Sequence, residues 1–425
     1  MVSGKQIMSF QYEVAVVGAG PAGLCAAVAS ARMGAKTALI EHEGTLGGNL
    51  TVGHVGPVMG SVSPGTLKDE IVSLLRTGGE CVQHDVEQTK IALAEWIGSE
   101  NIDVFLRSHV TDAILRGNTI AGVRISAPGS EMDIHAQIVI DATGDGNIAS
   151  RAGAPFEIGR DDGLTQPSTI MFTLGGINPE ATIVCRHEED DTDIGGSSYL
   201  QLCRDAEKSG ELPENVSIVR LYPTLRPDER MINASQLNGK NGLDPKEIAQ
   251  AEFRLRAQLP VIHHFLQKHI PGFADSYIKD SSEMAGFRET RRIQGEYILT
   301  AEDIIAGRAF PDAVVHKANF CIDIHNPDGG GQAESEGCPQ QAQDYDIPYR
   351  CLLPLRVENL LVAGRCISGT HRAHASYRVM GICMATGQAA GIAAALAVQQ
   401  GKSPRSVDAQ QIRKLLMENG AVLED

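Results

Sequence analysis

The sequence predicts an α/β fold in which a Rossmann-like domain, built on a central parallel sheet, carries an inserted α+β domain. Three apolar segments predict the sheet, because a continuous apolar run is typical of a strand that is buried on both faces. They begin at Tyr12, Ile138 and Val357, and each runs into glycine. The sequence between residues 155 and 330 then forms the insert, which is expected to cover the substrate.

The first segment, YEVAVVGAGPAG, leads a strand directly into the pattern Gly-x-Gly-x-x-Gly. Gly18 permits a tight turn, Gly20 lets the backbone approach a pyrophosphate, and Gly23 lets the following helix pack closely on the strand. We expect that helix over residues 24–33, with free N–H groups at its N-terminus for the phosphates. The predicted pyrophosphate-binding turn consists of Gly18, Gly20, Pro21, Ala22 and Gly23.

A second strand, over residues 36–40, ends at Glu41. An acidic residue about twenty positions after the glycines accepts the hydroxyl pair of a ribose in dinucleotide sites. The agreement of strand, helix, second strand and acidic residue favours a bound dinucleotide over a βαβ unit without one. In the next loop, Gly47, Gly48 and Asn49 are expected to bring backbone N–H groups to the phosphates or to a flavin edge. The alternative for this loop is a flexible connection.

The second and third segments, IVIDATGDG and VENLLVAGR, predict strands that end beside the same crevice. Ligands of open α/β sheets bind beyond the carboxyl ends of the strands, so the chain returns twice to the nucleotide. The residues expected to contact it there are Ala142, Thr143, Gly144, Gly364 and Arg365. This return divides the chain into nucleotide-binding parts at 1–155 and 331–425 and a substrate or cap domain at 156–330.

The middle of the chain predicts the helices and strands of the cap. Asp244 is suited to be the N-cap of a helix that runs to about residue 269, and Pro follows it at the first helical position. His263 and His264 are adjacent on this helix and point in different directions, so we predict no metal site. Strands of the capping sheet are expected within residues 276–297.

Three motifs together, GAGPAG with Glu41, ATGDG, and NLLVAGR followed by GQAAGIAAA, are similar to those of the glutathione-reductase-like FAD flavoproteins. Within that superfamily the chain most resembles the bacterial FAD-dependent oxidoreductase family, whose neighbours are the fumarate reductase and succinate dehydrogenase flavoproteins. The most specific stretches, GFRETRRIQGEYILTAEDI and YDIPYRCLLPLRVENLLVAGRCIS, cover residues 286–304 and 345–368. The resemblance implies bound FAD and hydride transfer between flavin N5 and a small organic substrate, one that carries a carboxylate by analogy with the neighbours.

The stretch GTHRAHASYRVMGICMATGQAAG places two histidines and two arginines ahead of a long apolar helix that starts near Met380. In the families resembled, this last helix points its N-terminus, here with Gly381, at the pyrimidine end of the isoalloxazine. A helix dipole and nearby cations favour the negative charge of a reduced flavin. Many relatives carry an acidic residue for the ribitol where this chain has Arg365, so a backbone N–H is expected to make that contact instead.

Arginines and histidines near the flavin are the expected catalytic residues. FRETRR has the composition of a solvated face, but the resemblance aligns Arg288 with an arginine-rich element that approaches the flavin, and guanidinium suits a carboxylate or a developing oxyanion. Arg292 is a weaker candidate for the same role. His371 and His374 fit proton transfer because imidazole titrates near neutral pH, and the alternative for each is a flavin contact or a packing role. Arg378 is expected to share with Arg288 the task of holding a substrate carboxylate.

His325, in FCIDIHNPDGGG, is a secondary candidate that precedes a glycine-rich loop over the substrate, and a structural histidine is the alternative. Two other functions stay open. ATGDG also resembles the Gly-Asp motif of flavin monooxygenases, and a flavin-bearing subunit that modifies RNA or anchors a partner enzyme belongs to a different class. No second GxGxxG motif is present for a nicotinamide nucleotide, so electrons are expected to pass to or from a quinone, a protein carrier or the substrate itself.

Composition narrows the range of partners. The net charge of −16 is spread along the chain without a basic run, which argues against nucleic acid as a partner. Nine cysteines without a CxxC pair disfavour a disulfide reductase and the zinc and iron–sulfur spacings. Residues 1–11 lack the pattern of a signal peptide, and no apolar run is expected to reach the length that crosses a bilayer. We expect a cytoplasmic protein that acts on a small molecule, with a homo-oligomer left open.

Overall fold

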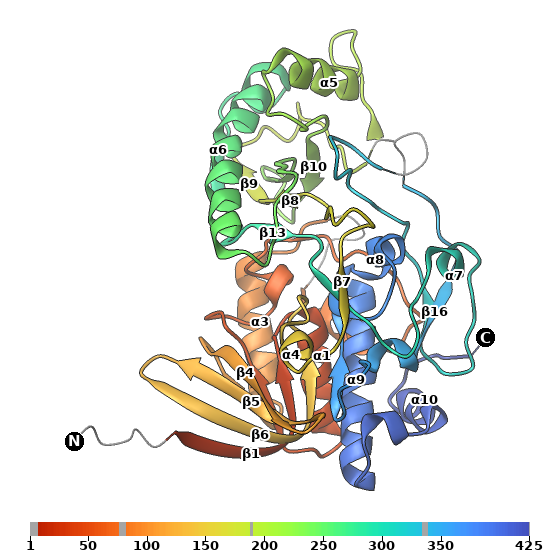
Figure 1. Cartoon of the computed structure of the whole chain (residues 1–425). Coiled ribbons are helices and arrows are strands. Elements are labelled where there is room, and N and C mark those ends of the chain that lie inside the picture. Colours follow the sequence, from red (N-terminus) through yellow and green to blue (C-terminus); the bar gives the residue numbers. More distant parts are fainter. Residues whose placement is uncertain (1–6, 76–81, 188–189, 334–338, 425) are drawn as a thin grey trace.

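The computed structural model describes residues 7–75, 82–187, 190–333 and 339–424. Figure 1 shows a lower part that contains the large sheet and an upper part, the cap, made from the middle of the chain. The first and last thirds of the chain lie side by side in the lower part, as the red and blue ribbons show. The chain therefore leaves the lower part, builds the cap, and returns.

The large sheet has the strand order β3-β2-β1-β6-β5-β4, and β17 pairs with β6 outside this path. Its strands are β1 (Met8–Val17), β2 (Thr37–Ile40), β3 (Ile102–Phe105), β4 (His109–Arg116), β5 (Thr119–Ala127), β6 (Ser130–Asp141) and β17 (Leu360–Val362). β6 is parallel to β1 along most of its length and parallel to β17 through its last residues, where Val362 lies beside Asp141. The carboxyl ends of β1, β6 and β17 therefore lie together, which confirms the predicted Rossmann-like sheet.

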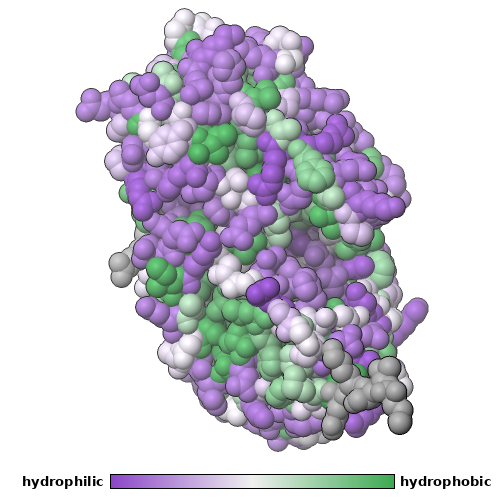
Figure 2. Space-filling model, turned by 90° about the vertical axis from the view of Figure 1, so that its left-hand side faces the viewer, coloured by the Kyte–Doolittle hydropathy of each residue, from purple (hydrophilic) through white to green (hydrophobic). Residues whose placement is uncertain are grey.

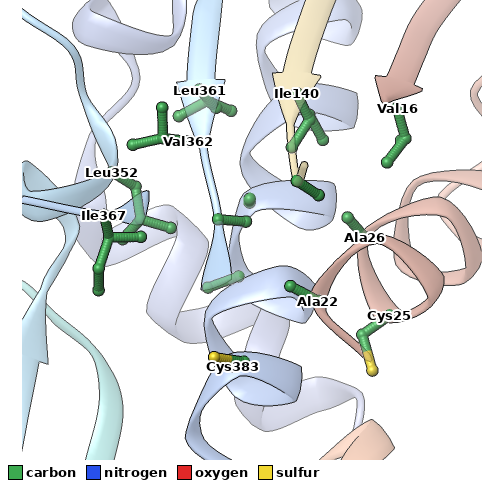
Figure 3. Close-up of a cluster of buried hydrophobic side chains, with 14 of the residues drawn as sticks. Val16, Ala22, Cys25, Ala26, Ile140, Leu352, Leu361, Val362, Ile367 and Cys383 are labelled. Carbon is green, nitrogen blue, oxygen red and sulfur yellow. The ribbon is translucent and has the colours of Figure 1, made fainter. Parts of the chain in front are cut away.

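Two helices with small side chains, α1 and α9, pack closely against each other beside this sheet. The helices of the lower part are α1 (Pro21–Arg32), α2 (Leu67–Leu75), α3 (Val86–Gly98), α4 (Asn147–Arg151), α7 (Ala301–Ile305), α8 (His371–Tyr377), α9 (Met380–Gln400) and α10 (Ala409–Glu418). A Cβ atom on Gly387 would lie 2.0 Å from the carbonyl oxygen of Ala22, and one on Gly391 would lie 2.3 Å from that of Ala26. Figure 3 shows Ala22 and Ala26 in the apolar cluster beneath the strand ends. Glycine is required in α9 because the two helix backbones approach so closely.

Helix α9 corrects one expectation from the sequence. It is long and apolar enough to cross a membrane, whereas the sequence analysis expects no run of that length. In the structure, 94% of its most apolar window is buried inside the protein. A helix that is apolar on every face is also typical of a protein core, and α9 packs against α1, α10 and the sheet. Hydrophilic residues cover most of the face seen in Figure 2, with a hydrophobic patch in its lower half.

The cap has a hydrophobic core of its own, formed by residues between Ile170 and Ala285. Its sheet has the order β10-β11-β9-β12. The elements of the cap are β9 (Phe172–Gly175), β10 (Arg220–Pro223), β11 (Arg230–Asn233), β12 (Tyr277–Ser281), α5 (Tyr199–Ser209) and α6 (Pro245–His269). The Asp244 carboxylate accepts hydrogen bonds from the N–H groups of Lys246 (2.8 Å) and Glu247 (3.2 Å), so the predicted helix start is confirmed.

Only one of the strands expected within residues 276–297, β12, joins the cap sheet. The next two form separate antiparallel pairs, which are β13 (Gly286–Phe287) with β8 (Ser168–Thr169) and β14 (Arg291–Ile293) with β7 (Phe156–Ile158). The charged FRETRR stretch explains the difference, because several of its side chains are used in contacts between the two parts of the molecule. From Ile293 onward the chain packs into the core of the large sheet, where β15 (Ala313–Ala318) pairs with β16 (Tyr345–Pro348). The division at residues 155 and 330 stays a prediction.

Candidate active site

The three glycine-bearing turns meet at one place. Gly18 has a φ of +96°, which favours glycine, and a Cβ atom on it would lie 2.6 Å from the carbonyl oxygen of Ala142 at the end of β6. A Cβ atom on Gly23 would lie 1.7 Å from the carbonyl oxygen of Gly18, so the start of α1 packs directly on the turn. After β17, a Cβ atom on Gly364 would lie 2.8 Å from the one on Ala22. The roles predicted for Gly18 and Gly23, turn and close packing, agree with these contacts.

Gly20 differs from the other glycines of its motif because no atom would lie within 4 Å of a Cβ atom on it. Open space therefore adjoins the backbone where the pyrophosphate is predicted to bind. Gly48 approaches this turn from the next loop, since a Cβ atom on it would lie 2.9 Å from the Cα of Gly20. The N–H of Gly47 donates to the carbonyl of Ala19 at 2.8 Å. The two loops thus form one cradle around the open space.

The loop with Asn49 is ordered by its own hydrogen bonds rather than being a flexible connection. Residues 48–50 form a single 3-10 turn. The hydroxyl of Thr51 donates to the carbonyl of Leu46 at 2.6 Å, and the N–H of Val55 donates to the carbonyl of Asn49 at 2.8 Å. The backbone of this loop is therefore fixed beside the Gly18 turn, as a phosphate-binding loop requires.

Glu41 is buried at the end of β2, and its Oε2 accepts the N–H of Ala19 at 2.6 Å. Its Oε1 accepts the N–H of Glu43 at 2.9 Å and lies 2.8 Å from Nδ1 of His42. Burial acts to raise the pKa of this carboxyl, but the hydrogen bonds outweigh burial and hold the pKa below its usual value. Glu41 is therefore an ionised carboxylate at the end of β2, and its contact with a ribose stays a prediction.

Arg365 uses its side chain to hold the protein together. Its guanidinium donates to the carbonyl of Gly144 at 3.0 Å, to Oδ1 of Asp145 at 2.5 Å, and to the carbonyl of Phe287. Thr143, in the same loop, is fixed by the carboxylate of Asp141, which accepts its N–H at 3.1 Å and its hydroxyl at 2.7 Å. The Arg365 side chain is thus committed to the loop after β6 and to β13, which leaves its backbone for the predicted ribityl contact.

Gly381 lies in the first turn of α9, against the loop that follows Asn49. Its N–H donates to the carbonyl of Met59 at 2.9 Å, and a Cβ atom on it would lie 2.1 Å from the carbonyl oxygen of Gly60. The sequence analysis expects this helix terminus to face the flavin. In the structure Gly381 itself is a packing glycine whose N–H is used by the protein.

His371 belongs to a buried ion-pair network. Its Nδ1 lies 2.9 Å from Oε1 of Glu289, a carboxylate with no exposed surface that also pairs with Arg292. The Arg292 guanidinium donates to the carbonyls of Gly369 (3.0 Å) and Gly159 (2.8 Å). These contacts join α8 to β14 and to the segment after β7. Arg292 and His371 thus belong to a structural network that joins the segments leading into and out of the cap to the lower part.

His374 is almost completely buried, with 1% of its surface exposed. Within the described residues, neither ring nitrogen has a hydrogen-bond partner. Burial, followed by the positive charges of Arg292 and Arg378, holds its pKa well below the usual value. The ring lies edge-on to Tyr377 at a centroid distance of 5.5 Å. His374 is therefore a neutral imidazole enclosed by protein, and solvent does not reach its nitrogens.

Arg288 faces a polar cavity under the cap. The empty space of this cavity is about 340 Å³, a figure that includes open solvent. It is lined by Asn215, Ser217, Ile218, Arg220, Asn233, Ala234, Ser235, Gln236, Arg288, His325 and Gly331. The guanidinium of Arg288 makes one hydrogen bond to the described residues, to the carbonyl of Pro167 at 2.6 Å. Burial, followed by the charge of Arg378, lowers the pKa of Arg288 to about 9. Among the described residues no carboxylate lies at ion-pair distance from Arg288, and the more distant Asp323 opposes this lowering of its pKa.

Arg378 is held beside the same cavity by Asp323. Its guanidinium donates to the Asp323 carboxylate at 3.1 Å and to the Asp323 carbonyl at 3.0 Å. Oδ1 of Asp323 accepts a hydrogen bond from Nε2 of Gln332 at 2.6 Å. Nε2 of His325 lies 3.4 Å from Oδ2, the oxygen that Arg378 also contacts. Gln166 accepts the N–H of His325 at 3.2 Å. The structure thus brings Arg288, His325 and Arg378 together and places His371 and His374 in other contacts.

Arg220, Asp323 and Gln166 are residues of this site that the sequence analysis does not identify. Arg220 lies on β10 opposite Asn233 of β11, and both line the cavity. None of the three stands in a recognisable motif. The one available signal was the position of Asp323 two residues before His325 in an apolar strand, where an acidic side chain requires a partner.

The sequence predicts that His263 and His264 do not form a metal site. Nε2 of His263 lies 3.0 Å from the carbonyl oxygen of Ser276, so this ring links α6 to the segment before β12. In the ranges that the structure describes, no group of three or more His, Cys, Asp or Glu side chains is placed to hold a metal ion.

Two groups of relatives match part of the chain. A digeranylgeranylglycerophospholipid reductase from Picrophilus torridus is 31% identical over 159 residues, which are 32% of this chain and 40% of that protein. A thiamine thiazole synthase from Pyrococcus horikoshii is 27% identical over 154 residues, which are 32% of this chain and 59% of that protein. The chain thus spans about half the length of the curated relatives it matches.

Nearly the whole chain shares its fold with a solved structure. A geranylgeranyl bacteriochlorophyll reductase-like protein from Thermoplasma acidophilum superposes with a TM-score of 0.50 at 16% identity, over 97% of this chain and 85% of that one. This low identity supports the fold alone. The profile of a family described as FAD dependent oxidoreductase matches residues 13–416. Because this match spans most of the chain, the chain belongs to the FAD dependent oxidoreductase family, a family of FAD-binding enzymes.

Proposed function

We propose that this enzyme transfers a hydride between FAD and a small organic substrate whose carboxylate binds to Arg288. The single observation that carries the proposal is a partly buried guanidinium that lines a cavity and has no carboxylate at ion-pair distance among the described residues. Burial of an unpaired cation is costly, and an anionic ligand removes that cost. The resemblance to the fumarate reductase flavoproteins implies a carboxylate substrate by analogy.

The residues present fit FAD and divide the work with it. Bound FAD supplies the two-electron chemistry, which amino-acid side chains do not offer. The cradle of Gly18, Gly20 and Gly48 would hold the pyrophosphate, and Glu41 the ribose. Arg288 orients the substrate by its carboxylate, and the cap, whose strands β10 and β11 contribute to the cavity, limits access of water.

The lining of the cavity favours a small polar substrate over a long apolar one. Eight of the eleven lining residues have polar side chains, and a prenyl chain offers them no hydrogen-bonding group. The relatives named as digeranylgeranylglycerophospholipid reductases act, by their name, on a lipid. The likeness to them covers about a third of this chain, so it does not extend their substrate to this cavity. A separate electron carrier, such as a quinone or a protein, is part of the proposal.

Anaerobic absorbance spectroscopy tests this function. The FAD-loaded enzyme is mixed with a panel of small carboxylates, and bleaching of the flavin band identifies a reductant. Arg288→Gln is expected to keep its flavin and to lower kcat/KM by about 10² to 10³-fold, because it removes one partner of a buried charge pair. Arg254→Gln, which changes an exposed arginine on α6, is the matched control and is expected to behave as the wild type.

Other results would point to the other functions. Equal turnover of Arg288→Gln and wild type with every carboxylate that bleaches the flavin would remove the proposed role of Arg288. Oxygen consumption coupled to hydroxylation of the substrate would identify a monooxygenase. Bleaching that occurs only in the presence of a second protein would identify a partner-anchoring subunit.

A further inference from the structure

We infer that the substrate is a 2-hydroxy acid and that His325, positioned by Asp323, accepts the proton of its hydroxyl group. The inference deepens the proposed function and rests on it, since it assigns the carboxylate to Arg288. It adds a second polar group to the substrate, a direction to the reaction, and a proton acceptor that differs from the histidines favoured by the sequence.

The geometry fixes the His325 ring in the wall of the Arg288 cavity. Both residues line that cavity. The backbone of His325 is held by its N–H, which donates to Gln166 at 3.2 Å, and by a strand bridge to Gln332. Nε2 of the ring lies 3.4 Å from the Asp323 carboxylate. A carboxylate at Nε2 favours the tautomer with its proton there, which leaves the lone pair of Nδ1 as the acceptor.

Asp323 has the properties of a positioning residue. Burial acts to raise its pKa, but His325 and Arg378 outweigh burial and hold the pKa well below its usual range. Its oxygens are shared among Arg378, Gln332 and His325. A carboxylate in that position stays ionised and stabilises the imidazolium that forms when His325 takes a proton.

The charges around His325 select the direction of proton transfer. Burial, followed by the positive charge of Arg288, lowers the pKa of His325 to about 4, while Asp323 opposes them and Arg220 on β10 adds to them. Arg378, the C-cap residue of α8, contacts Asp323 through its guanidinium. The ring is therefore neutral at neutral pH, and its Nδ1 lone pair, left free by the Asp323 contact at Nε2, is the group placed to accept a proton. Oxidation of an alcohol needs such an acceptor, whereas reduction of a C=C bond needs a donor.

The complete step is balanced by the substrate and FAD alone. Bound FAD would supply the two-electron oxidant, which takes up the electron pair of the C2–H bond as a hydride when that bond breaks. The O–H bond breaks and its proton passes to Nδ1 of His325. The C–O single bond becomes a C=O bond, and the product is a 2-oxo acid. We place the carboxylate and the hydroxyl on neighbouring carbons, because Arg288 and His325 line the same cavity.

His371 and His374 do not fit this task. Nδ1 of His371 already pairs with Glu289, and that carboxylate also holds Arg292. The nitrogens of His374 are closed off from solvent by protein. His325 is the histidine that lines the cavity.

Matched pairs of acids test the substrate class. Lactate, malate and 2-hydroxyglutarate, each as both enantiomers, are compared with propionate, succinate and glutarate, which lack the hydroxyl group. We expect anaerobic bleaching of the flavin by at least one hydroxy acid and by none of the partners without hydroxyl. 3-Hydroxybutyrate, whose hydroxyl is one carbon further away, is expected to bleach the flavin at least 10-fold more slowly.

A binding measurement separates the two proposals. Calorimetric titration of the oxidised enzyme with pyruvate and 2-oxoglutarate requires no turnover. Arg288→Gln is expected to weaken binding of the 2-oxo acid at least 10-fold, and His325→Gln to leave it within about threefold while the bleaching rate falls by about 10² to 10⁴-fold. If neither hydroxylated nor plain carboxylates bind or bleach, the proposed function fails. If plain carboxylates bleach the flavin through Arg288 and hydroxy acids do not, only the present inference fails.

Chemical rescue tests the proton acceptor itself. His325→Ala is expected to regain bleaching when imidazole is added, with a rate that rises with the concentration of neutral imidazole. Asp323→Asn should slow bleaching without rescue, because the ring is still present. His264→Gln, at an exposed histidine on α6, serves as the control and should match the wild type. Bleaching by His325→Ala at the wild-type rate without imidazole would overturn the assignment.

Discussion

The FAD cradle and the cavity under the cap bind their ligands by opposite means. The cradle is made of backbone: Gly20 is open to its ligand because it lacks a side chain, and Gly23 lets α1 close on the turn. The cavity is made of side chains that come from distant segments, with Arg220 on β10, Arg288 after β13 and His325 after β15. A backbone site needs a local pattern of small residues, whereas a side-chain site needs the whole fold. The following changes test this contrast, beginning with the largest effect.

Gly23→Ala is expected to have the largest effect of all. Its Cβ atom would lie 1.7 Å from the carbonyl oxygen of Gly18, so the helix and the turn could not keep their present distance. Overpacking against backbone has no flexible side chain to yield, and we expect a loss of at least about 3 kcal/mol in the free energy of unfolding. Urea unfolding followed by circular dichroism measures this loss.

Gly20→Val, in the same motif, is the matched contrast. No atom lies within 4 Å of the position of its Cβ, so the protein is expected to fold with a loss of about 1 kcal/mol at most, the range for a helix N-cap. It should nevertheless purify with less than a tenth of the wild-type flavin, measured by absorbance of the released FAD. A fully loaded Gly20→Val protein would contradict the assignment of the cradle.

The same contrast explains what the sequence predicts and what it does not. The strands and turns around Gly18, Ala142 and Gly364 were predictable because each apolar run and each glycine acts within a few residues. Asp244 was predictable as an N-cap for the same reason. The partners of Arg288 were not, since whether an arginine is solvated or buried depends on the cap. His371 and His374 lie in a conspicuous motif, yet tertiary contacts direct one to Glu289 and enclose the other.

Glu289→Gln tests the buried network of Glu289, Arg292 and His371. Its loss of stability should be the second largest. It leaves the guanidinium of Arg292, whose side chain is 3% exposed, buried without its closest carboxylate. Breaking a buried ion pair at one partner costs about 3 to 5 kcal/mol. Some relief is expected from the carbonyls of Gly159 and Gly369, which still accept from Arg292, so we expect the lower end of that range in urea unfolding.

Glu157→Gln is the control for this change, because Arg292 has a second carboxylate at its surface. The side chain of Glu157 is 50% exposed and lies 3.4 Å from the same guanidinium. Exposed pairs contribute about 0 to 1 kcal/mol, so this variant should lose far less stability. Equal losses in the two variants would show that burial of the Glu289 pair has no special energetic weight.

The smallest effect is expected at His42, the side chain that supports the cradle from outside. Its hydrogen bond to Glu41 raises the pKa of His42, and burial only partly opposes that shift. Because the pKa of His42 is higher in the folded protein, the pair stabilises the fold fully at pH values below 6.5, the pKa in the unfolded chain. This contribution is lost as the pH rises through the higher pKa of the folded protein.

His42→Asn should therefore lower the free energy of unfolding at pH 6 and leave it unchanged at pH 9. Because the side chain is 52% exposed, the difference is expected to be below about 1 kcal/mol. The affinity for FAD should change less than threefold, since Glu41 keeps its bonds from the N–H groups of Ala19 and Glu43. Urea unfolding and flavin titration at the two pH values measure both quantities. A large loss of flavin at either pH would mean that a side chain outside the cradle determines binding, and that the contrast between the two regions is incorrect.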